Sequence, residues 1–211
     1  MKGAIFDIDG TLLDSMPIWD QLAERYLKSL GITPEPDLSR TIFHMSLPQG
    51  AAYIHDHHPI DQTPGEIEEG VLNCLKDFYY KEVTDKADAI SYVRKLQERK
   101  IPLAIASTSE RPLIEHALKR LGILDCFSHI LVCSEHATKK REPAIYHMAA
   151  EKLGLLPGQI MVYEDALYAM ETARSAGFLV TAVYDEASKD SWEAACRISQ
   201  AQVRESFKEL L

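Results

Sequence analysis

The apolar residues change their spacing along the chain, and this change divides the sequence into three parts. A short apolar run, Ala4–Phe6, opens the chain and indicates a buried strand. Between residues 17 and 82 the apolar positions recur at helical spacing, as in Pro64–Tyr80, and no strand-like run interrupts them. From Ala89 onward, helix-like and strand-like stretches alternate. The pattern therefore predicts a helical block inserted into a chain of alternating helices and strands.

The alternating part predicts a parallel sheet. Near-continuous apolar strands are expected at residues 101–106, 130–133, 160–163 and 178–183. The helical stretches between them each end at a glycine, a residue that commonly terminates helices: Gly122, Gly154 and Gly177. Strands of this kind are typical of a parallel sheet that is covered by helices on both faces.

The predicted fold class is therefore α/β, with a Rossmann-like parallel sheet core and an inserted helical cap domain. We expect residues 1–14 and 86–211 to form the core and residues 15–85 to form the cap. At the end of the chain, Val203–Leu211 is expected to be a closing helix without visible chemistry.

Two acidic residues follow the first predicted strand directly. Ligands of open parallel sheets bind outside the carboxyl ends of the strands, so Asp7 and Asp9 stand where chemistry is expected. Alternate residues of an extended segment point to the same face, which places the two carboxylates together. Because they repel each other unless a cation or a proton lies between them, they could hold Mg²⁺, which prefers oxygen ligands. Taken alone, the Asp-x-Asp pattern is more often two surface acids that flank a turn.

Polar groups also follow three other predicted strands. Ser107 and Thr108 offer a hydroxyl and backbone N–H groups for an anion, although a plain helix cap has the same appearance. The Lys139–Arg141 cluster could be a solvated loop, or it could supply a lysine that neutralises a phosphoryl group. Glu164 and Asp165 add oxygen ligands for a metal, or simply favour the start of a helix.

Taken together and in order, these four segments resemble the four motifs of the haloacid dehalogenase-like superfamily of Mg²⁺-dependent phosphoryl-transfer enzymes. The helical insertion after the first motif resembles the cap of the subgroup that includes β-phosphoglucomutase and phosphoglycolate phosphatase. Relatives usually read Lys-Pro-x-Pro in the third motif, whereas this chain has Arg141 in place of the first proline. The spacing to Pro143 favours Lys140 as the functional lysine and leaves Lys139 as the alternative.

The resemblance implies a mechanism that passes through an aspartyl-phosphate. Asp7 would attack phosphorus, and Asp9 would protonate the leaving oxygen and then activate water. Asp7, the backbone carbonyl of Asp9 and Asp165 would hold Mg²⁺, with Glu164 acting directly or through water. The phosphoryl oxygens would be bound by the second and third motifs, through Ser107, the Thr108 N–H and Lys140.

The same resemblance favours a phosphatase that acts on a small phosphomonoester such as a sugar phosphate. Dehalogenases and phosphonate hydrolases of the superfamily lack the second aspartate, Asp9. In β-phosphoglucomutases a cap arginine binds the distal phosphate, whereas the corresponding stretch here, His44–Leu47, has Leu47 at that position. A sugar-phosphate mutase is the alternative, and a non-catalytic binding module is a more distant one.

Composition limits the partners and the compartment. The net charge of −9 argues against nucleic-acid and anionic-membrane partners, which favour basic surfaces. The four cysteines show no paired spacing and the N-terminus has no signal-peptide pattern, so we expect a cytoplasmic monomer with reduced thiols. The histidine-rich segment His55–His58 is more typical of a helix end than of a metal site.

Overall fold

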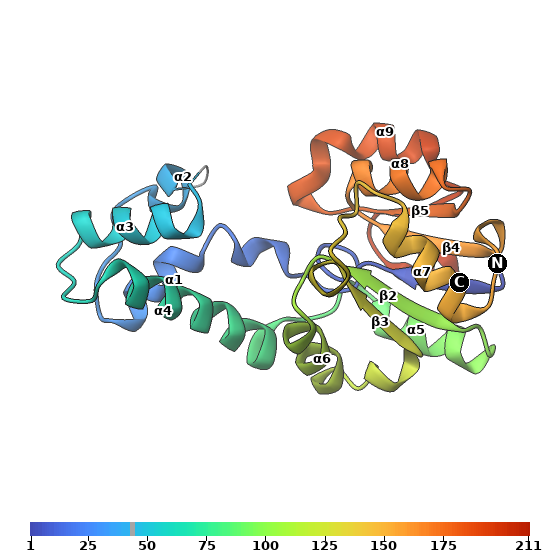
Figure 1. The fold of residues 1–211 in the computed structure, drawn as a ribbon, viewed down its shortest axis with the longest axis horizontal. Coiled ribbons are helices and arrows are strands. Elements are labelled where there is room, and N and C mark those ends of the chain that lie inside the picture. Colours follow the sequence, from blue (N-terminus) through green and yellow to red (C-terminus); the bar gives the residue numbers. More distant parts are fainter. Residues whose placement is uncertain (43–44) are drawn as a thin grey trace. The chain divides into compact units, whose positions relative to one another are not determined.

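The computed structural model describes residues 1–42 and 45–211, which divide into two compact units (Figure 1). The core unit comprises residues 1–15 and 83–211, and the helical unit comprises residues 16–82. In the core unit, the segments that lead to and from the helical unit run side by side. The Asp14 N–H donates to the Thr84 carbonyl and the Lys86 N–H donates to the Leu12 carbonyl, both at 2.9 Å.

The described residues of the core unit form one six-stranded sheet in the order β3-β2-β1-β4-β5-β6. All of its strand pairs are parallel, which confirms the predicted fold class. The strands are β1 Gly3–Phe6, β2 Leu103–Ser107, β3 His129–Val132, β4 Ile160–Glu164, β5 Leu179–Val183 and β6 Ala201–Val203. The first strand therefore lies in the interior of the sheet, between β2 and β4.

Helices follow the strands and cover the sheet. Their bounds are α5 Ala89–Glu98, α6 Arg111–Arg120, α7 Ala144–Leu153, α8 Leu167–Ser175 and α9 Trp192–Ile198. One face of the sheet packs against α7, α8 and α9 through a cluster that includes Ile5, Ile145 and Met170. The side chain of Phe6 belongs to the other face, where it stacks on Tyr163 at 4.2 Å between ring centroids. This alternation follows the two-residue period of a strand.

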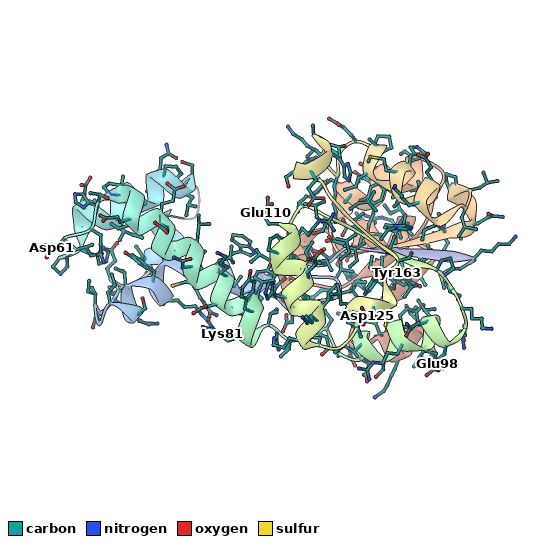
Figure 2. The ribbon with its side chains drawn as sticks, turned by 60° about the horizontal axis from the view of Figure 1, so that its bottom comes forward. Asp61, Lys81, Glu98, Glu110, Asp125 and Tyr163 are labelled. Atoms are coloured by element: carbon teal, nitrogen blue, oxygen red, sulfur yellow. The ribbon has the colours of Figure 1, made fainter. Side chains whose placement is uncertain are left out.

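Figure 2 shows Tyr163 within the core unit and Glu98 and Asp125 at its surface. The hydroxyl of Tyr163 lies 2.6 Å from that of Tyr92 on α5, so that the two buried tyrosines share a hydrogen bond, and the Tyr163 hydroxyl also donates to Met1 Sδ at 3.5 Å. Aromatic rings thus fill the sheet face opposite α7, α8 and α9.

The prediction of a closing helix over Val203–Leu211 is wrong. Val203 ends β6, which pairs with β5, and a short 3₁₀ turn over Phe207–Leu210 follows. The free edge of β5 accepts these residues as a further strand, and the apolar side chains of Val203 and Phe207 are buried there. Local helical spacing cannot reveal such pairing with a distant strand.

The helical unit contains α1 Leu22–Ser29, α2 Leu38–Ile42, α3 Leu47–His57 and α4 Pro64–Asp77, followed by a π-helical turn over Phe78–Glu82. Its described residues contain no strand, as predicted. Two helix starts are fixed by capping boxes, in which Ser46 pairs with Gln49 and Thr63 pairs with Glu66. The buried residues of α4 are the stripe Ile67, Val71 and Leu75.

Candidate active site

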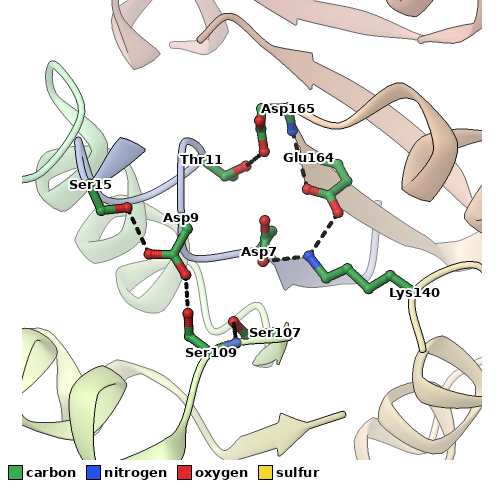
Figure 3. A network of polar contacts seen from close by, with 9 residues as sticks. All are labelled: Asp7, Asp9, Thr11, Ser15, Ser107, Ser109, Lys140, Glu164 and Asp165. Carbon is green, nitrogen blue, oxygen red and sulfur yellow. Dashed lines mark hydrogen bonds and ion pairs between the residues drawn. The ribbon is translucent and has the colours of Figure 1, made fainter. Parts of the chain in front are cut away.

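The carboxyl ends of β1, β2 and β4 bring together residues that are far apart in the sequence (Figure 3). Asp7 directly follows β1, and its N–H donates to the Tyr163 carbonyl at 3.0 Å. Ser107 and Glu164 are the last residues of β2 and β4. Since these strands are parallel neighbours of β1, their ends lie at the same edge of the sheet.

Lys140 reaches this edge from the loop between β3 and α7. Its side chain is 3% exposed, and its ammonium contacts Asp7 Oδ1 and lies 2.7 Å from Glu164 Oε1. The neighbouring Lys139 is exposed. Of the two lysines that the sequence offers, the fold therefore buries Lys140 against the carboxylates.

Three carboxylates form a cluster beside this lysine. Asp7, Glu164 and Asp165 each offer an oxygen, and these oxygens lie within 4.8 Å of one another. Asp165 is also held by Thr11, whose hydroxyl donates to Asp165 Oδ1 at 3.2 Å. Carboxylate oxygens at this spacing suit a hard divalent cation.

Asp9 is held in a different way from the other acids. Its Oδ1 accepts a hydrogen bond from the Ser15 hydroxyl at 2.7 Å, and its Oδ2 accepts one from the Ser109 hydroxyl. The Asp9 side chain is thus oriented by hydroxyl groups, and the proposed role of its backbone carbonyl in binding a metal stays a prediction.

Ser15, Ser109 and Thr11 were missed by the sequence reasoning. The alternation of strand residues carried a signal for Ser109, because it lies two positions beyond Ser107. Ser15 and Thr11 are fully buried polar residues, which becomes evident only in the folded chain.

The second predicted motif lies at the same edge. Ser107 is completely buried, and its hydroxyl oxygen accepts the Ser109 N–H at 3.0 Å. Its hydroxyl hydrogen is therefore directed elsewhere, since the oxygen already acts as an acceptor in this bond. Thr108 is exposed. Binding of phosphoryl oxygens by Ser107 and the Thr108 N–H stays a prediction.

A model of haloacid dehalogenase-like hydrolases matches residues 1–177, which include all of these motifs. The chain belongs to this family. Membership agrees with the order of the motifs and with their position at the carboxyl edge of a parallel sheet. The chain is accordingly an enzyme of a hydrolase family.

Similar proteins have been characterised or solved within this haloacid dehalogenase-like family. A phosphorylated carbohydrates phosphatase from Thermotoga maritima is 26% identical over 84% of this chain and 82% of its own length. Hexitol phosphatase A from Escherichia coli is 28% identical over 86% and 82%, respectively. A putative β-phosphoglucomutase from Thermotoga maritima has the same fold, with a TM-score of 0.83, 24% identity and complete coverage of both chains.

The electrostatics of this haloacid dehalogenase-like site favour a cation. Burial, and then the charge of Asp7, raise the pKa of Asp165 to about 7, although Lys140 opposes the shift. Burial and Asp7 likewise raise the pKa of Glu164 well above its ordinary value. Burial alone would lower the pKa of Lys140, but Asp7 and Glu164 raise it well above its ordinary value. One ammonium thus faces three carboxyl groups, and a divalent cation would balance the remaining charge.

Arg141 occupies a position at which relatives usually have a proline, and its side chain contacts Tyr168. Its guanidinium lies over the ring of Tyr168, 4.4 Å from the ring centroid. Such cation–π contacts are modestly stabilising at exposed sites. Because Arg141 follows Lys140 and Tyr168 lies on α8, the contact joins the loop that carries the lysine to the helix that follows Asp165.

The histidine-rich segment does not form a shared metal site. The Nδ1 atoms of His55, His57 and His58 contact the separate carbonyls of Gln62, Tyr53 and Ile54. Within residues 1–42 and 45–211, the group with metal-ligand geometry is the acidic cluster described above. His44, which was considered as a substrate contact, lies outside the described residues.

No helix formed by the described residues combines the length and the apolar character needed to cross a bilayer. The thiols of Cys74, Cys126, Cys133 and Cys196 are free.

Proposed function

We propose that this chain is a Mg²⁺-dependent phosphatase that hydrolyses a small phosphomonoester, most simply a sugar phosphate, through an aspartyl-phosphate. Residues 15–85 would form the cap domain, and residues 1–14 and 86–211 would form the catalytic core. The observation that carries the proposal is the buried Lys140 ammonium between Asp7 and Glu164, beside Asp165. A nucleophilic carboxylate, a neutralising cation and further oxygen ligands at one sheet edge are what phosphoryl transfer requires.

In the first half of the reaction, an Asp7 carboxylate oxygen forms a bond to phosphorus while the bond from phosphorus to the substrate oxygen breaks. Asp9 gives its proton to the departing oxygen. The hydroxyls of Ser15 and Ser109 hold the Asp9 carboxyl group in one orientation during this transfer. Lys140, together with Ser107 and the Thr108 N–H, binds the phosphoryl oxygens.

In the second half, water attacks phosphorus and the bond to Asp7 breaks. Asp9, now a carboxylate, accepts the proton of that water, so that the enzyme returns to its starting state. Lys140 stays protonated in both halves of the reaction because its pKa is raised. Its positive charge therefore balances the negative charge of the phosphoryl group and the carboxylates.

A divalent metal fits the oxygen donors of this site. Asp7, the backbone carbonyl of Asp9 and Asp165 would hold it, with Glu164 acting directly or through water. When bound, Mg²⁺ supplies charge neutralisation for the phosphoryl group and helps to align it with the nucleophile.

The names of related enzymes support the substrate class. The Thermotoga maritima relative is named for phosphorylated carbohydrates, and the Escherichia coli relative for hexitol. We further propose a cytoplasmic monomer. The net charge of −9 supports the absence of nucleic-acid and anionic-membrane partners. The presence of Asp7, Asp9 and Lys140 argues against a purely binding module.

Phosphate release from a panel of sugar and polyol phosphates, measured with Mg²⁺ and with a chelator, tests the proposal. We expect release that depends on Mg²⁺. A parallel reaction with a glucose phosphate and a bisphosphate primer tests the mutase alternative. Formation of an isomerised sugar phosphate without free phosphate would show a mutase in place of the phosphatase. Absence of both products would favour the binding module.

A further inference from the structure

Lys140 lies in a tight turn whose two central side chains point to different places. The Glu142 N–H donates to the Lys139 carbonyl at 2.9 Å, which closes a β-turn with Lys140 and Arg141 at its centre. The Lys140 side chain is buried and extends to two carboxylates of the candidate site, as Figure 3 shows. Arg141 is exposed. The turn therefore presents one cation to the site and the next one to the protein surface.

Arg141 ties this turn to α8. Its guanidinium lies 4.4 Å from the centroid of the Tyr168 ring. A planar guanidinium stacks on an aromatic face, which a compact ammonium cannot do in the same way. Tyr168 is the second residue of α8 and comes three residues after Asp165, which belongs to the acidic cluster. The contact thus links the segment that carries the lysine of the site to the segment that carries its acids.

The surroundings leave much of this link to the one contact. Arg141 and Tyr168 line a surface cavity of about 580 Å³ between α7 and α8, together with His147 and Thr172 among others. Because this space is open, the turn does not rest on packed apolar side chains there. Within the described residues, the polar and ring contacts that join side chains of residues 139–142 to helices or strands, or to Asp7 after β1, are those of Lys140 and Arg141.

Only one of these two anchors stays the same throughout the proposed reaction. When Asp7 carries the phosphoryl group it is an acyl phosphate and no longer a free carboxylate, so its ion pair with Lys140 is lost. Lys140 then directs N–H donors to the phosphoryl oxygens. Arg141 and Tyr168 take no part in the bonds that form and break. Their contact can therefore hold the turn in both halves of the reaction.

We propose that Arg141 is a positioning residue that holds the Lys140 turn on α8 by stacking on Tyr168, and so keeps the Lys140 ammonium aligned with the phosphoryl group. The inference rests on the proposed phosphatase function and adds to it a residue outside the reacting groups. A proline, which relatives usually have at this position, restricts the backbone of the turn itself. Arginine restricts the same turn through a contact with another element.

The first test measures the protection of Lys140 without any substrate. An amine-reactive reagent labels lysines in proportion to their accessibility, and mass spectrometry gives the labelling ratio of Lys140 to the exposed Lys139. Arg141→Ala and Tyr168→Ala should each raise this ratio about two- to fivefold, which corresponds to a cation–π contact at an exposed site. The double variant should show no further rise. Tyr168→Phe keeps the ring face and should restore the protection.

Phosphate release tests the consequence for catalysis. Arg141→Ala and Tyr168→Ala should each lower kcat about two- to fivefold, with a smaller change in KM and no further loss in the double variant. Because Arg141 acts through Lys140, adding Arg141→Ala to Lys140→Met should lower kcat no further. Both side chains of the contact are exposed, so Tm should change by less than about 4 °C in either single variant. General destabilisation would lower Tm more.

A labelling ratio that is the same in the wild type and in Arg141→Ala would overturn the proposal for Arg141 and leave the phosphatase function standing. An unchanged kcat in Arg141→Ala would overturn it as well. A full loss of kcat on adding Arg141→Ala to Lys140→Met would show instead that the guanidinium acts on the substrate directly. If the wild-type protein releases no phosphate from any ester, the phosphatase function fails by itself, and the labelling ratio still decides whether Arg141 positions Lys140.

Discussion

Replacement of Lys140 by methionine should affect stability and activity together. The ammonium is 3% exposed and lies 2.7 Å from Glu164 Oε1, while Glu164 itself is completely buried. Methionine keeps most of the side-chain volume but removes the charge. The buried carboxyl groups of Asp7 and Glu164 would then lose their cationic partner.

The size of the effect follows from the burial of the pair. Breaking a buried ion pair by removing one partner costs about 3–5 kcal/mol of folding free energy. For a chain of this size, about 1 kcal/mol shifts Tm by about 2–4 °C, so Lys140→Met should lower Tm by roughly 10 °C in a chelator. The loss should be smaller with Mg²⁺, because the cation compensates the same carboxylates. Since Lys140 would also bind the phosphoryl group, kcat should fall about 100- to 1,000-fold.

Thermal unfolding and phosphate release, each measured with Mg²⁺ and with a chelator, check these values. Lys139→Met is the matched control, because it removes an exposed neighbouring charge and should leave both quantities unchanged. Adding Glu164→Gln to Lys140→Met should recover much of the lost Tm without recovering activity. Unchanged Tm and activity in Lys140→Met, or equal losses in Lys139→Met, would refute the assignment of the lysine.

Two further predictions concern the acids of the site. The raised pKa of Asp165, about 7 without metal, means that the folded protein binds a proton more tightly than the unfolded chain. The metal-free protein should therefore gain stability as pH falls from 7 toward the ordinary value of about 3.9. Mg²⁺ should bind up to about tenfold more weakly for each unit by which the pH falls over that range, because protons compete for the carboxylate. Titration calorimetry at several pH values would measure the affinity. An affinity that does not change with pH would contradict the prediction. Ser109→Ala removes a hydrogen-bond donor to Asp9, so kcat should fall about tenfold while the affinity for Mg²⁺ stays unchanged. A weaker affinity for Mg²⁺ with a normal kcat would instead assign Ser109 to the metal site.

The sequence allowed the sheet to be predicted because its strands are buried on both faces and appear as continuous apolar runs. The acidic groups were found for a related reason, since they stand at or directly after the ends of those runs. Lys140 lies further along, in the loop between β3 and α7, and was selected because its segment resembles a family motif. β6 was missed because its three residues form a strand only through pairing with β5. The partners of Asp9 were missed because Ser15 and Ser109 approach it only in the folded chain.

Within residues 1–42 and 45–211, the buried hydroxyl of Tyr146 has no hydrogen-bond partner, which is information that the sequence does not carry. In the sequence, Tyr146 is one of the apolar positions of a helix that packs on the sheet. Whether its hydroxyl finds a partner depends on atoms that other elements contribute in the folded chain. Hydrophobic spacing predicts that the ring is buried, but it gives no information on the hydrogen bonding of the hydroxyl.

Chemical trapping of the covalent intermediate tests the role of Asp7 most directly. The protein is mixed with its best ester and Mg²⁺ and quenched in acid within one turnover. Borohydride then reduces any acyl phosphate, which converts an aspartyl-phosphate to homoserine. We predict homoserine at position 7, found by mass spectrometry of the N-terminal peptide, and none in Asp7→Asn, which should also release no phosphate. Rapid phosphate release without homoserine at position 7, or with undiminished activity in Asp7→Asn, would contradict nucleophilic attack by Asp7.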